Sequence, residues 1–197
     1  MTVPVRTEKN ELRQLYRERR LSLGADEKAS RDGAICRAAV SLASYRFSKN
    51  VLLYAPTDEE IDVMPIALDA LSKGKRVAFP RCNAENRTMK YRVVSSLDEL
   101  ESGYSGILEP PESAPALEAE EDFASSICFV PALVYDTKGY RLGYGKGFYD
   151  RFLYSFGGNA VGVVYSDFIT DGVPRGRYDV QIKILLTEKG VIVTGEN

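Results

Sequence analysis

Short apolar segments alternate with segments of helical pattern along this chain, and that alternation limits its fold more than any other feature. The apolar runs occupy residues 50–55, 75–80, 127–134, 160–165 and 182–187. Helical spacing of apolar residues marks 7–23, 26–42, 62–73 and 147–156. Strands that are apolar on both faces are typical of parallel sheets covered by helices. The pattern predicts an α/β fold: a single-domain layered fold over 1–197, with a mostly parallel central sheet flanked by helices.

Individual residues set the expected ends of these elements. Thr7 is expected to cap the first helix and Asp62 the third, and Gly74 is expected to end the third. A strand of alternating pattern is expected at 89–94, and a last hairpin at Gly190. The proline-rich stretch 103–117, whose acidic character continues to residue 122, is expected to form a long surface loop.

The composition excludes several kinds of site. The 197 residues include no histidine, so a Ser-His-Asp triad, a Cys-His dyad or an imidazole metal site cannot be built. The three cysteines form no CxxC pair, and the apolar neighbours of Cys36 and Cys128 predict buried, reduced thiols. Chemistry must therefore come mainly from Lys, Arg, Asp, Glu, hydroxyl groups and backbone amides.

Charge and hydropathy bear on partners and location. No apolar run has the length of a membrane span, and the opening segment Met1–Arg6 lacks the apolar core of a secretion signal. We therefore expect a cytoplasmic protein with no membrane partner. A net charge of -2 argues against a nucleic-acid partner. A monomeric chain is expected.

A glycine-rich loop between the 127–134 run and the next helix carries the most chemical information. Its glycines and cations are Gly139, Gly143, Gly145, Gly147, Arg141 and Lys146. Ligands of parallel α/β sheets bind at the carboxyl ends of strands, where glycine amides and a helix N-terminus can hold phosphate. The spacing is neither that of a Walker P-loop nor that of a Rossmann fingerprint. The alternative is a glycine-rich turn that binds no phosphate.

The segment 129–152 resembles the signature of the 5-formyltetrahydrofolate cyclo-ligase (5,10-methenyltetrahydrofolate synthetase) family, and the resemblance extends over nearly the whole chain. The other matching pieces are, in order, Lys9-x-x-x-Arg13, Glu60-Ile61-Asp62, Phe79-Pro80-Arg81, Met89-Lys90-Tyr91, Gly106-Ile107-Leu108-Glu109-Pro110 and Asp179 before Leu186-Thr187-Glu188-Lys189-Gly190. The glycine-rich segment is the most specific piece. The shared order of all the pieces supports the resemblance more than any short piece does.

The resemblance implies an ATP-dependent ligase that closes 5-formyltetrahydrofolate to 5,10-methenyltetrahydrofolate. Its partners would be these small molecules, and its cofactor would be Mg²⁺. ATP would phosphorylate the formyl oxygen, the neighbouring nitrogen would attack the activated carbon, and phosphate would leave. Phosphoryl transfer is mostly positioning and charge neutralisation, which a chain without histidine can supply.

The resemblance also implies site residues. The ATP-binding residues would be Lys9, Arg13, Arg141, Leu142, Gly143, Tyr144, Gly145, Lys146, Gly147, Phe148 and Tyr149, of which Arg141 and Lys146 would be catalytic. The substrate-binding residues would be Tyr54, Ala55, Glu60, Tyr144, Gly145, Lys146, Gly147 and Phe148. The Mg²⁺ carboxylates would be Asp150 and Asp179.

Several of these roles have a structural alternative. Lys9, Arg13 and Arg17 recur every fourth residue along one helix face, which can meet phosphate or form a solvated basic stripe. For Arg17 the solvated stripe remains the interpretation. Glu60 can hold pterin nitrogens through paired hydrogen bonds, or stabilise the dipole of the helix that follows. Arg81 can pair with a folate glutamate tail or with a surface carboxylate.

Two positions depart from the family pattern. Tyr178 precedes Asp179 where many members have histidine, and Lys183 stands where another aspartate is common. These changes motivate a second hypothesis, a folate- or nucleotide-binding module without turnover. A third hypothesis is an RNA-associated protein that uses the basic helix 9–20, and the negative net charge disfavours it.

Overall fold

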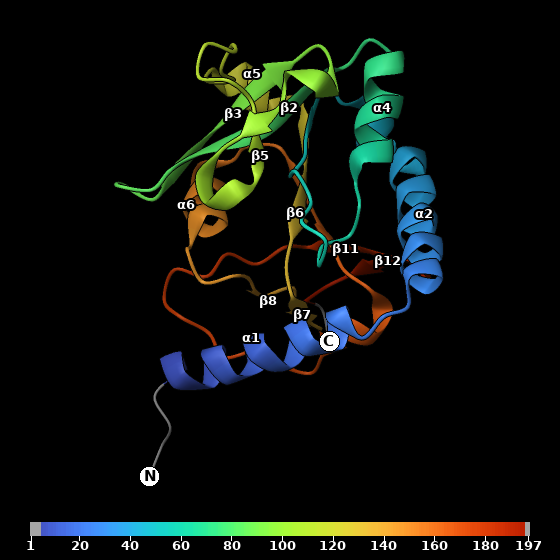
Figure 1. Cartoon of the computed structure of the whole chain (residues 1–197), viewed down its shortest axis with the longest axis vertical. Coiled ribbons are helices and arrows are strands. Elements are labelled where there is room, and N and C mark those ends of the chain that lie inside the picture. The colour runs from blue at the N-terminus through green and yellow to red at the C-terminus, as the bar shows by residue number, and fades with distance from the viewer. Residues whose placement is uncertain (1–4, 196–197) are drawn as a thin grey trace.

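The computed structural model describes residues 5–195 and is built around a seven-stranded sheet (Figure 1). The strands are, in spatial order, β12 (Gly190–Val193), β11 (Ile184–Thr187), β9 (Asn159–Val163), β6 (Ser126–Pro131), β1 (Asn50–Leu52), β2 (Arg76–Asn83) and β3 (Thr88–Val94). The five inner strands are mutually parallel, whereas β12 and β3 are antiparallel edges. This confirms the predicted α/β layered fold with a mostly parallel sheet. Residues 1–4, in the opening segment Met1–Arg6, lie outside the described range.

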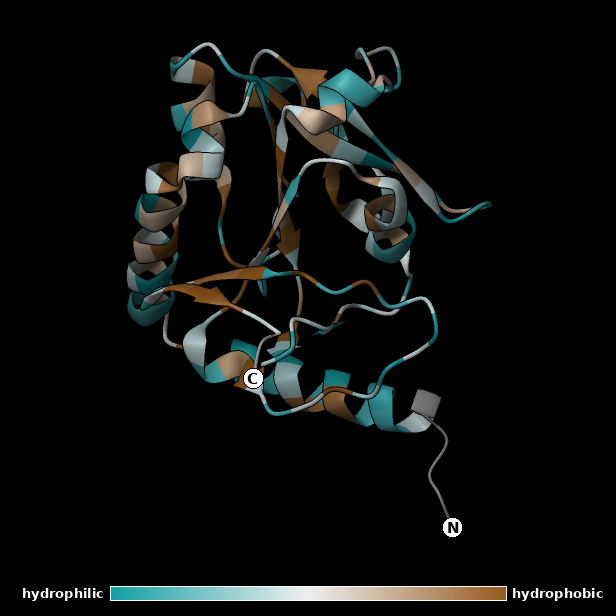
Figure 2. Ribbon diagram, turned by 180° about the vertical axis from the view of Figure 1, so that it is seen from behind, coloured by the Kyte–Doolittle hydropathy of each residue, from teal (hydrophilic) through white to brown (hydrophobic). Residues whose placement is uncertain are grey.

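The inner strands are apolar on both faces because helices and loops cover both. Every side chain from Ser126 to Val130 is buried, and Figure 2 shows the central strands in the brown of hydrophobic residues. Packing is tight at Gly162 in β9, where an added Cβ would lie 2.6 Å from the Tyr135 ring and 2.6 Å from a Leu185 methyl group. The core therefore fixes the position of β9 against β11.

Helices cover the sheet unequally. They are α1 (Val5–Leu21), α2 (Ala25–Ser41), α3 (Ala43–Phe47), α4 (Met64–Ser72), α5 (Glu120–Ala124) and α6 (Phe148–Ser155). In Figure 1, α2 and α4 lie together on one side of the sheet, α6 lies on the other side beneath β3, and α1 crosses one end of the molecule. Among residues 5–195, no helix has the length and apolarity that a membrane span requires.

Two small sheets complete the fold. One contains β10 (Ile169–Thr170), β7 (Val134–Asp136) and β8 (Arg141–Leu142), and the other contains β4 (Glu101–Ser102) and β5 (Leu108–Glu109). Short 3₁₀ turns cover 97–99, 104–106 and 166–168. Because β8 ends at Leu142, the glycine-rich stretch 143–147 connects this small sheet directly to α6.

The apolar run 127–134 differs from its prediction as one strand. It is divided between β6 and β7, which belong to different sheets. Pro131 has no N–H group with which to extend the ladder, and the carbonyl oxygens of Ala132 and Leu133 accept hydrogen bonds from Arg20 instead. The expected strand 50–55 likewise ends at Leu52.

Other local expectations had mixed outcomes. α1 begins before Thr7, so Thr7 lies inside the helix and is not its cap. Val63 is the N-cap of α4, although Asp62 Oδ1 does accept the Met64 N–H at 2.9 Å. Gly74 follows the end of α4 with φ of +70°, and a hairpin does form at Gly190, as expected.

The acidic stretch is more ordered than the predicted loop. It contains β5 and α5 and is hydrogen-bonded along the edge of β3, through Val93 N–H to Pro115 and Leu117 N–H to Tyr91. The thiols of Cys36 and Cys128 are buried and unpaired, which confirms that prediction.

Candidate functional site

A cavity of about 660 Å³ lies at the carboxyl ends of the parallel strands. Its walls come from α1, the loop after β1, the β2–β3 pair, the 104–109 segment and the glycine-rich loop with the start of α6. Segments far apart in the sequence therefore build a single site.

Every residue implied by the family resemblance lines this cavity. The set is Lys9, Arg13, Tyr54, Ala55, Glu60, Arg141, Leu142, Gly143, Tyr144, Gly145, Lys146, Gly147, Phe148, Tyr149, Asp150 and Asp179. The structure thus brings together residues up to 170 positions apart, such as Lys9 and Asp179. Their individual roles remain predictions.

The backbone of the glycine-rich loop adopts conformations that only glycine reaches easily. Gly145 has φ of +92° and Gly147 has φ of +72°, and Gly147 is also the N-cap of α6. Arg13 braces the loop from α1, because its Nε donates to the Gly143 carbonyl at 2.8 Å. A Cβ added at Gly145 would lie 3.1 Å from the Arg13 guanidinium carbon. The loop therefore packs closely against one cation of α1.

Two ion pairs join the predicted phosphate cations to the predicted metal carboxylates. Lys9 Nζ lies 2.7 Å from Asp179 Oδ2, and Arg141 Nη2 lies 2.6 Å from Asp150 Oδ1. The two pairs are adjacent, since the N–H of Val180 also donates to Asp150 Oδ1 at 3.2 Å. Lys146 is exposed at the rim and has no ion pair among the side chains that the structure describes. It is thus available to a bound anion.

Asp150 and Asp179 are suited in type and number to Mg²⁺. This ion is commonly held by one or two protein carboxylates, with phosphate oxygens and water as the other ligands. Between residues 5 and 195 there is no group of three or more His, Cys, Asp or Glu that could hold a metal ion unaided. The residues present therefore fit an ion that arrives with a nucleotide.

Glu60 is a buried carboxylate in the loop after β1 and lines the same cavity. It is 7% exposed, and its Oε2 accepts hydrogen bonds from the Thr57 amide at 3.0 Å and the Thr57 hydroxyl at 3.1 Å. Burial raises the pKa of this carboxyl, and these two hydrogen bonds oppose the rise. Because the carboxylate is bonded within its own turn, the structure does not place it on the first N–H groups of α4. Tyr54 steadies the same loop by donating its hydroxyl to the Ile61 carbonyl at 2.8 Å.

One wall of the cavity was not assigned from the sequence. It consists of Pro80, Cys82, Met89, Tyr104, Ser105, Ile107 and Glu109. Glu109 is 4% exposed and accepts the Cys82 N–H at 3.0 Å, and the Tyr104 ring meets the Phe148 ring edge-on at 5.9 Å. The signal was present, because most of this wall comes from the family pieces 79–81, 89–91 and 106–110. Those pieces were matched in order without being given roles.

The remaining candidates lie at or beyond the rim. Arg17 reaches the cavity mouth, but it is exposed and pairs with Glu59 through two bonds of 2.9 and 2.7 Å. Arg81 pairs with Glu101 at 3.0 Å, which agrees with its surface alternative. Tyr178 and Lys183 are both exposed and do not line the cavity, so the departures from the family pattern lie outside it.

Comparison with known proteins identifies the family of the chain. The model of the 5-formyltetrahydrofolate cyclo-ligase family matches residues 5–188. The 5-formyltetrahydrofolate cyclo-ligase of Mycolicibacterium smegmatis is 34% identical over 154 residues, which cover 74% of this chain and 76% of that one. The probable 5-formyltetrahydrofolate cyclo-ligase of Schizosaccharomyces pombe is 31% identical over 147 residues, covering 74% and 71%.

The fold is shared as well as the sequence. The NMR structure of Aquifex aeolicus 5,10-methenyltetrahydrofolate synthetase superposes with a TM-score of 0.82 at 32% identity, covering 96% of this chain and 94% of that one. The family match over nearly the whole chain, the relatives above 30% identity and this shared fold agree with one another. The chain belongs to the 5-formyltetrahydrofolate cyclo-ligase family.

Proposed function

We propose that this chain uses MgATP to close 5-formyltetrahydrofolate to 5,10-methenyltetrahydrofolate, with release of ADP and phosphate. One observation carries the proposal: a single cavity contains a phosphate-type wall next to an apolar and aromatic wall with buried carboxylates. A site of this kind suits two ligands that must react with each other, one a polyphosphate and the other a flat ring system.

The phosphate wall would bind the nucleotide. The amides of 143–147, the N-terminus of α6 and the free ammonium of Lys146 supply positive potential for phosphate oxygens. Lys9 and Arg141 can turn to phosphate when Asp179 and Asp150 take Mg²⁺, which would neutralise charge on the phosphate oxygens. In this arrangement Lys9 and Arg141 would change partner from carboxylate to phosphate, and neither Asp150 nor Asp179 would be left without a cation.

The apolar and aromatic wall would bind the folate. Pro80, Met89 and Phe148 offer apolar surface to a flat pterin ring, and Glu60 offers a carboxylate oxygen to its N–H groups. A carboxylate fixed by Thr57 is already oriented, so little conformational entropy is lost when the ring binds. The proposed reaction requires the formyl group of the bound ring to face the glycine-rich loop.

The reaction then needs two displacements. The formyl oxygen attacks the γ-phosphorus, the bond to the bridging oxygen of ADP breaks, and Lys146 stabilises the charge on the transferred group. The neighbouring amine of the folate attacks the formyl carbon with its lone pair. The carbon–oxygen bond to phosphate breaks, phosphate leaves with the electron pair, and the amine loses its proton.

The test is turnover of the purified protein with MgATP and 5-formyltetrahydrofolate. We expect the absorbance of the methenyl product to grow in step with ADP, one for one, and to stay flat when ATP is omitted. Product formed without ATP would refute the phosphorylation step. Tight binding of either ligand without any turnover would instead support the non-catalytic module.

A further inference from the structure

Arg20, in the last turn of α1, is a buried guanidinium with no carboxylate partner among the residues that the structure describes. The residue is 4% exposed, and its hydrogen bonds within the described part of the chain all go to backbone carbonyls. Burial of an unpaired cation is costly, so such residues are uncommon. The presence of this buried cation therefore requires an explanation, which lies in the segments that it joins.

Its bonds join two segments of the active-site region. Nη1 donates to the Glu59 carbonyl at 3.2 Å, in the loop after β1. Nη2 donates to the carbonyls of Ala132 at 2.5 Å and Leu133 at 3.3 Å, between β6 and β7. The Nε atom is buried and has no hydrogen-bond partner in the described structure. The guanidinium carbon also lies 5.5 Å from the centre of the Phe168 ring, a cation–π distance.

These segments carry groups of both ligand sites. Glu59 directly precedes Glu60 on the folate wall. Leu133 donates its N–H to the Leu142 carbonyl at 2.9 Å, one residue before the glycine-rich loop. Arg20 also lies eleven residues after Lys9, about three helical turns, so both project from one face of α1. A single side chain therefore ties the nucleotide-binding helix to the folate-binding loop and to the strand end beneath the phosphate loop.

We propose that Arg20 is a positioning residue that fixes the nucleotide and folate walls in register, so that the γ-phosphate meets the formyl oxygen. It does not line the cavity, so it would touch neither ligand. The inference rests on the proposed function. The planar fork of arginine holds several donors in a fixed geometry that suits carbonyls from two chain segments, whereas the compact ammonium of lysine cannot reproduce that geometry. Loss of the fork would move two bound ligands relative to each other without removing a ligand contact.

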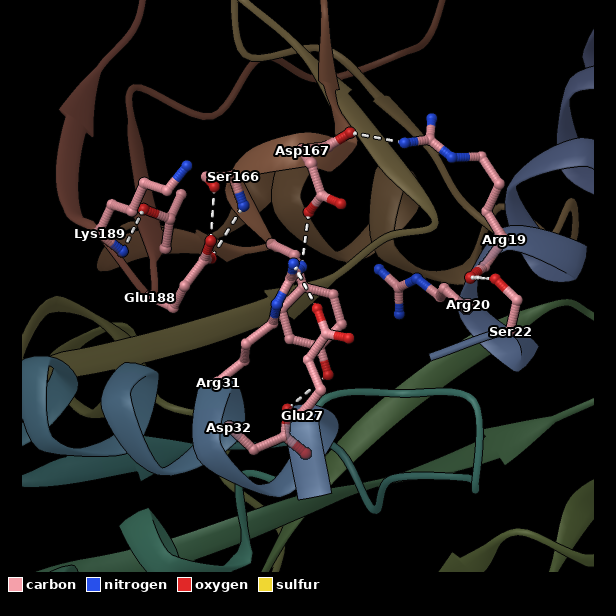
Figure 3. Close-up of polar contacts among 12 residues, drawn as sticks. Arg19, Arg20, Ser22, Glu27, Arg31, Asp32, Ser166, Asp167, Glu188 and Lys189 are labelled. Carbon is pink, nitrogen blue, oxygen red and sulfur yellow. Dashed lines mark hydrogen bonds and ion pairs between the residues drawn. The ribbon is translucent and has the colours of Figure 1, made fainter. Parts of the chain in front are cut away.

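Arg19 provides a matched control next to it. Figure 3 shows Arg19 reaching the backbone of Asp167 while Arg20 extends in another direction. Arg19 is exposed, donates to the Asp167 carbonyl at 3.2 Å and lies 4.9 Å from the same Phe168 ring. The two arginines are neighbours on α1, and each donates to a backbone carbonyl and lies near the Phe168 ring. They differ in burial and in the segments that they join.

The experiment compares Arg20→Met, Arg20→Lys and Arg19→Met in the full chain. We measure kcat, the affinity for a non-hydrolysable ATP analogue with Mg²⁺, and separately the affinity for 5-formyltetrahydrofolate. For Arg20→Met we expect kcat to fall about 10- to 100-fold, because a misplacement near 1 Å costs about that much. Each separate affinity is expected to change less than about threefold, because no ligand contact is removed. Arg20→Lys should recover part of kcat, and Arg19→Met should match the parent.

Each outcome has a defined meaning. An unchanged kcat in Arg20→Met, or a loss of affinity for one ligand that equals the loss of kcat, would overturn the positioning role. An equal loss in Arg19→Met would also overturn it. If Arg20→Met does not fold, Arg20→Lys decides, and a parental kcat in that variant counts against the proposal. Absence of turnover in the parent protein would refute the proposed function itself, and this inference with it.

Discussion

Substitution of Gly145 by alanine tests the geometry of the glycine-rich loop. The residue has φ of +92°, and its new Cβ would lie 3.1 Å from the guanidinium carbon of Arg13. The positive φ costs an alanine about 1–2 kcal/mol. For a chain of this size that corresponds to a fall in Tm of about 2–8 °C. The close contact adds a second effect, because Arg13 must move away from the Gly143 carbonyl that it bonds at 2.8 Å.

The second effect is expected in the kinetics. A hydrogen bond from a charged group contributes about 1.5–3 kcal/mol. If the displaced Arg13 no longer reaches phosphate, KM for ATP should rise about 10- to 100-fold, while KM for the folate changes little. Thermal unfolding and steady-state kinetics with ATP varied measure the two effects separately.

Two other glycines provide the controls. Gly74 has φ of +70° with no neighbour within 4 Å of an added Cβ, so Gly74→Ala should lower Tm and leave KM for ATP unchanged. Gly143 has neither a positive φ nor a close neighbour, so Gly143→Ala should be mild in both measurements. The reasoning fails if Gly145→Ala raises KM for ATP no more than Gly74→Ala does. It fails equally if Gly143→Ala has as large an effect.

Three further changes are expected to separate roles within the site. Lys146→Ala should lower kcat about 100- to 1,000-fold with an unchanged Tm, because it removes the charge that would stabilise the transferred phosphate in the proposed reaction; the exposed Lys183→Ala, outside the cavity, should match the parent in the same assay. Asp150→Asn should raise the Mg²⁺ concentration for half-maximal rate about tenfold, and an unchanged Mg²⁺ titration would remove Asp150 from the metal role. Burial raises the pKa of Glu60 above its ordinary 4.5, so ionisation of this carboxyl destabilises the fold as the pH rises. Glu60→Gln should therefore be more stable than the parent at pH 8, by about 1.4 kcal/mol for each unit of the pKa shift, and equal to it below about pH 4; urea unfolding at both pH values would show a constant difference if the reasoning is wrong.

The central sheet could be predicted from the sequence because its strands are apolar on both faces. This pattern can be recognised without knowing which strands pair with one another. The same pattern could not show that 127–134 divides between two sheets. Pro131 indicates such a break, whereas the uninterrupted apolar run around it favours one continuous strand. The residue type of Thr7 favours a helix cap, whereas the helix begins two residues earlier.

The cavity-lining residues were predicted where a local motif or the family resemblance names them, and the Tyr104–Glu109 wall was missed. The glycine-rich loop is continuous in sequence, so its members could be named together. The Tyr104–Glu109 wall comes from a short two-stranded sheet and a 3₁₀ turn, which have too few residues to show a period. Arg20 could not be distinguished from Arg19 by composition or helical spacing, because only its burial against two distant carbonyl segments sets it apart.

The position of β1 inside the sheet, between β6 and β2, has a consequence for how the protein is made. Residues 25–94 can assemble α2, α4 and a three-stranded piece from neighbouring parts of the chain, but that piece ends at an open β1. The other neighbour of β1 is β6, in which Ser126 pairs with Asn50. Ser126 leaves the ribosome 76 residues after Asn50. Until then the apolar edge of β1 stays uncovered, and an uncovered strand edge is prone to aggregation with other chains. The ligand cavity lies between the part of the sheet that forms first and the part that β6 begins. During synthesis the cavity can therefore form only when these two parts of the sheet have joined.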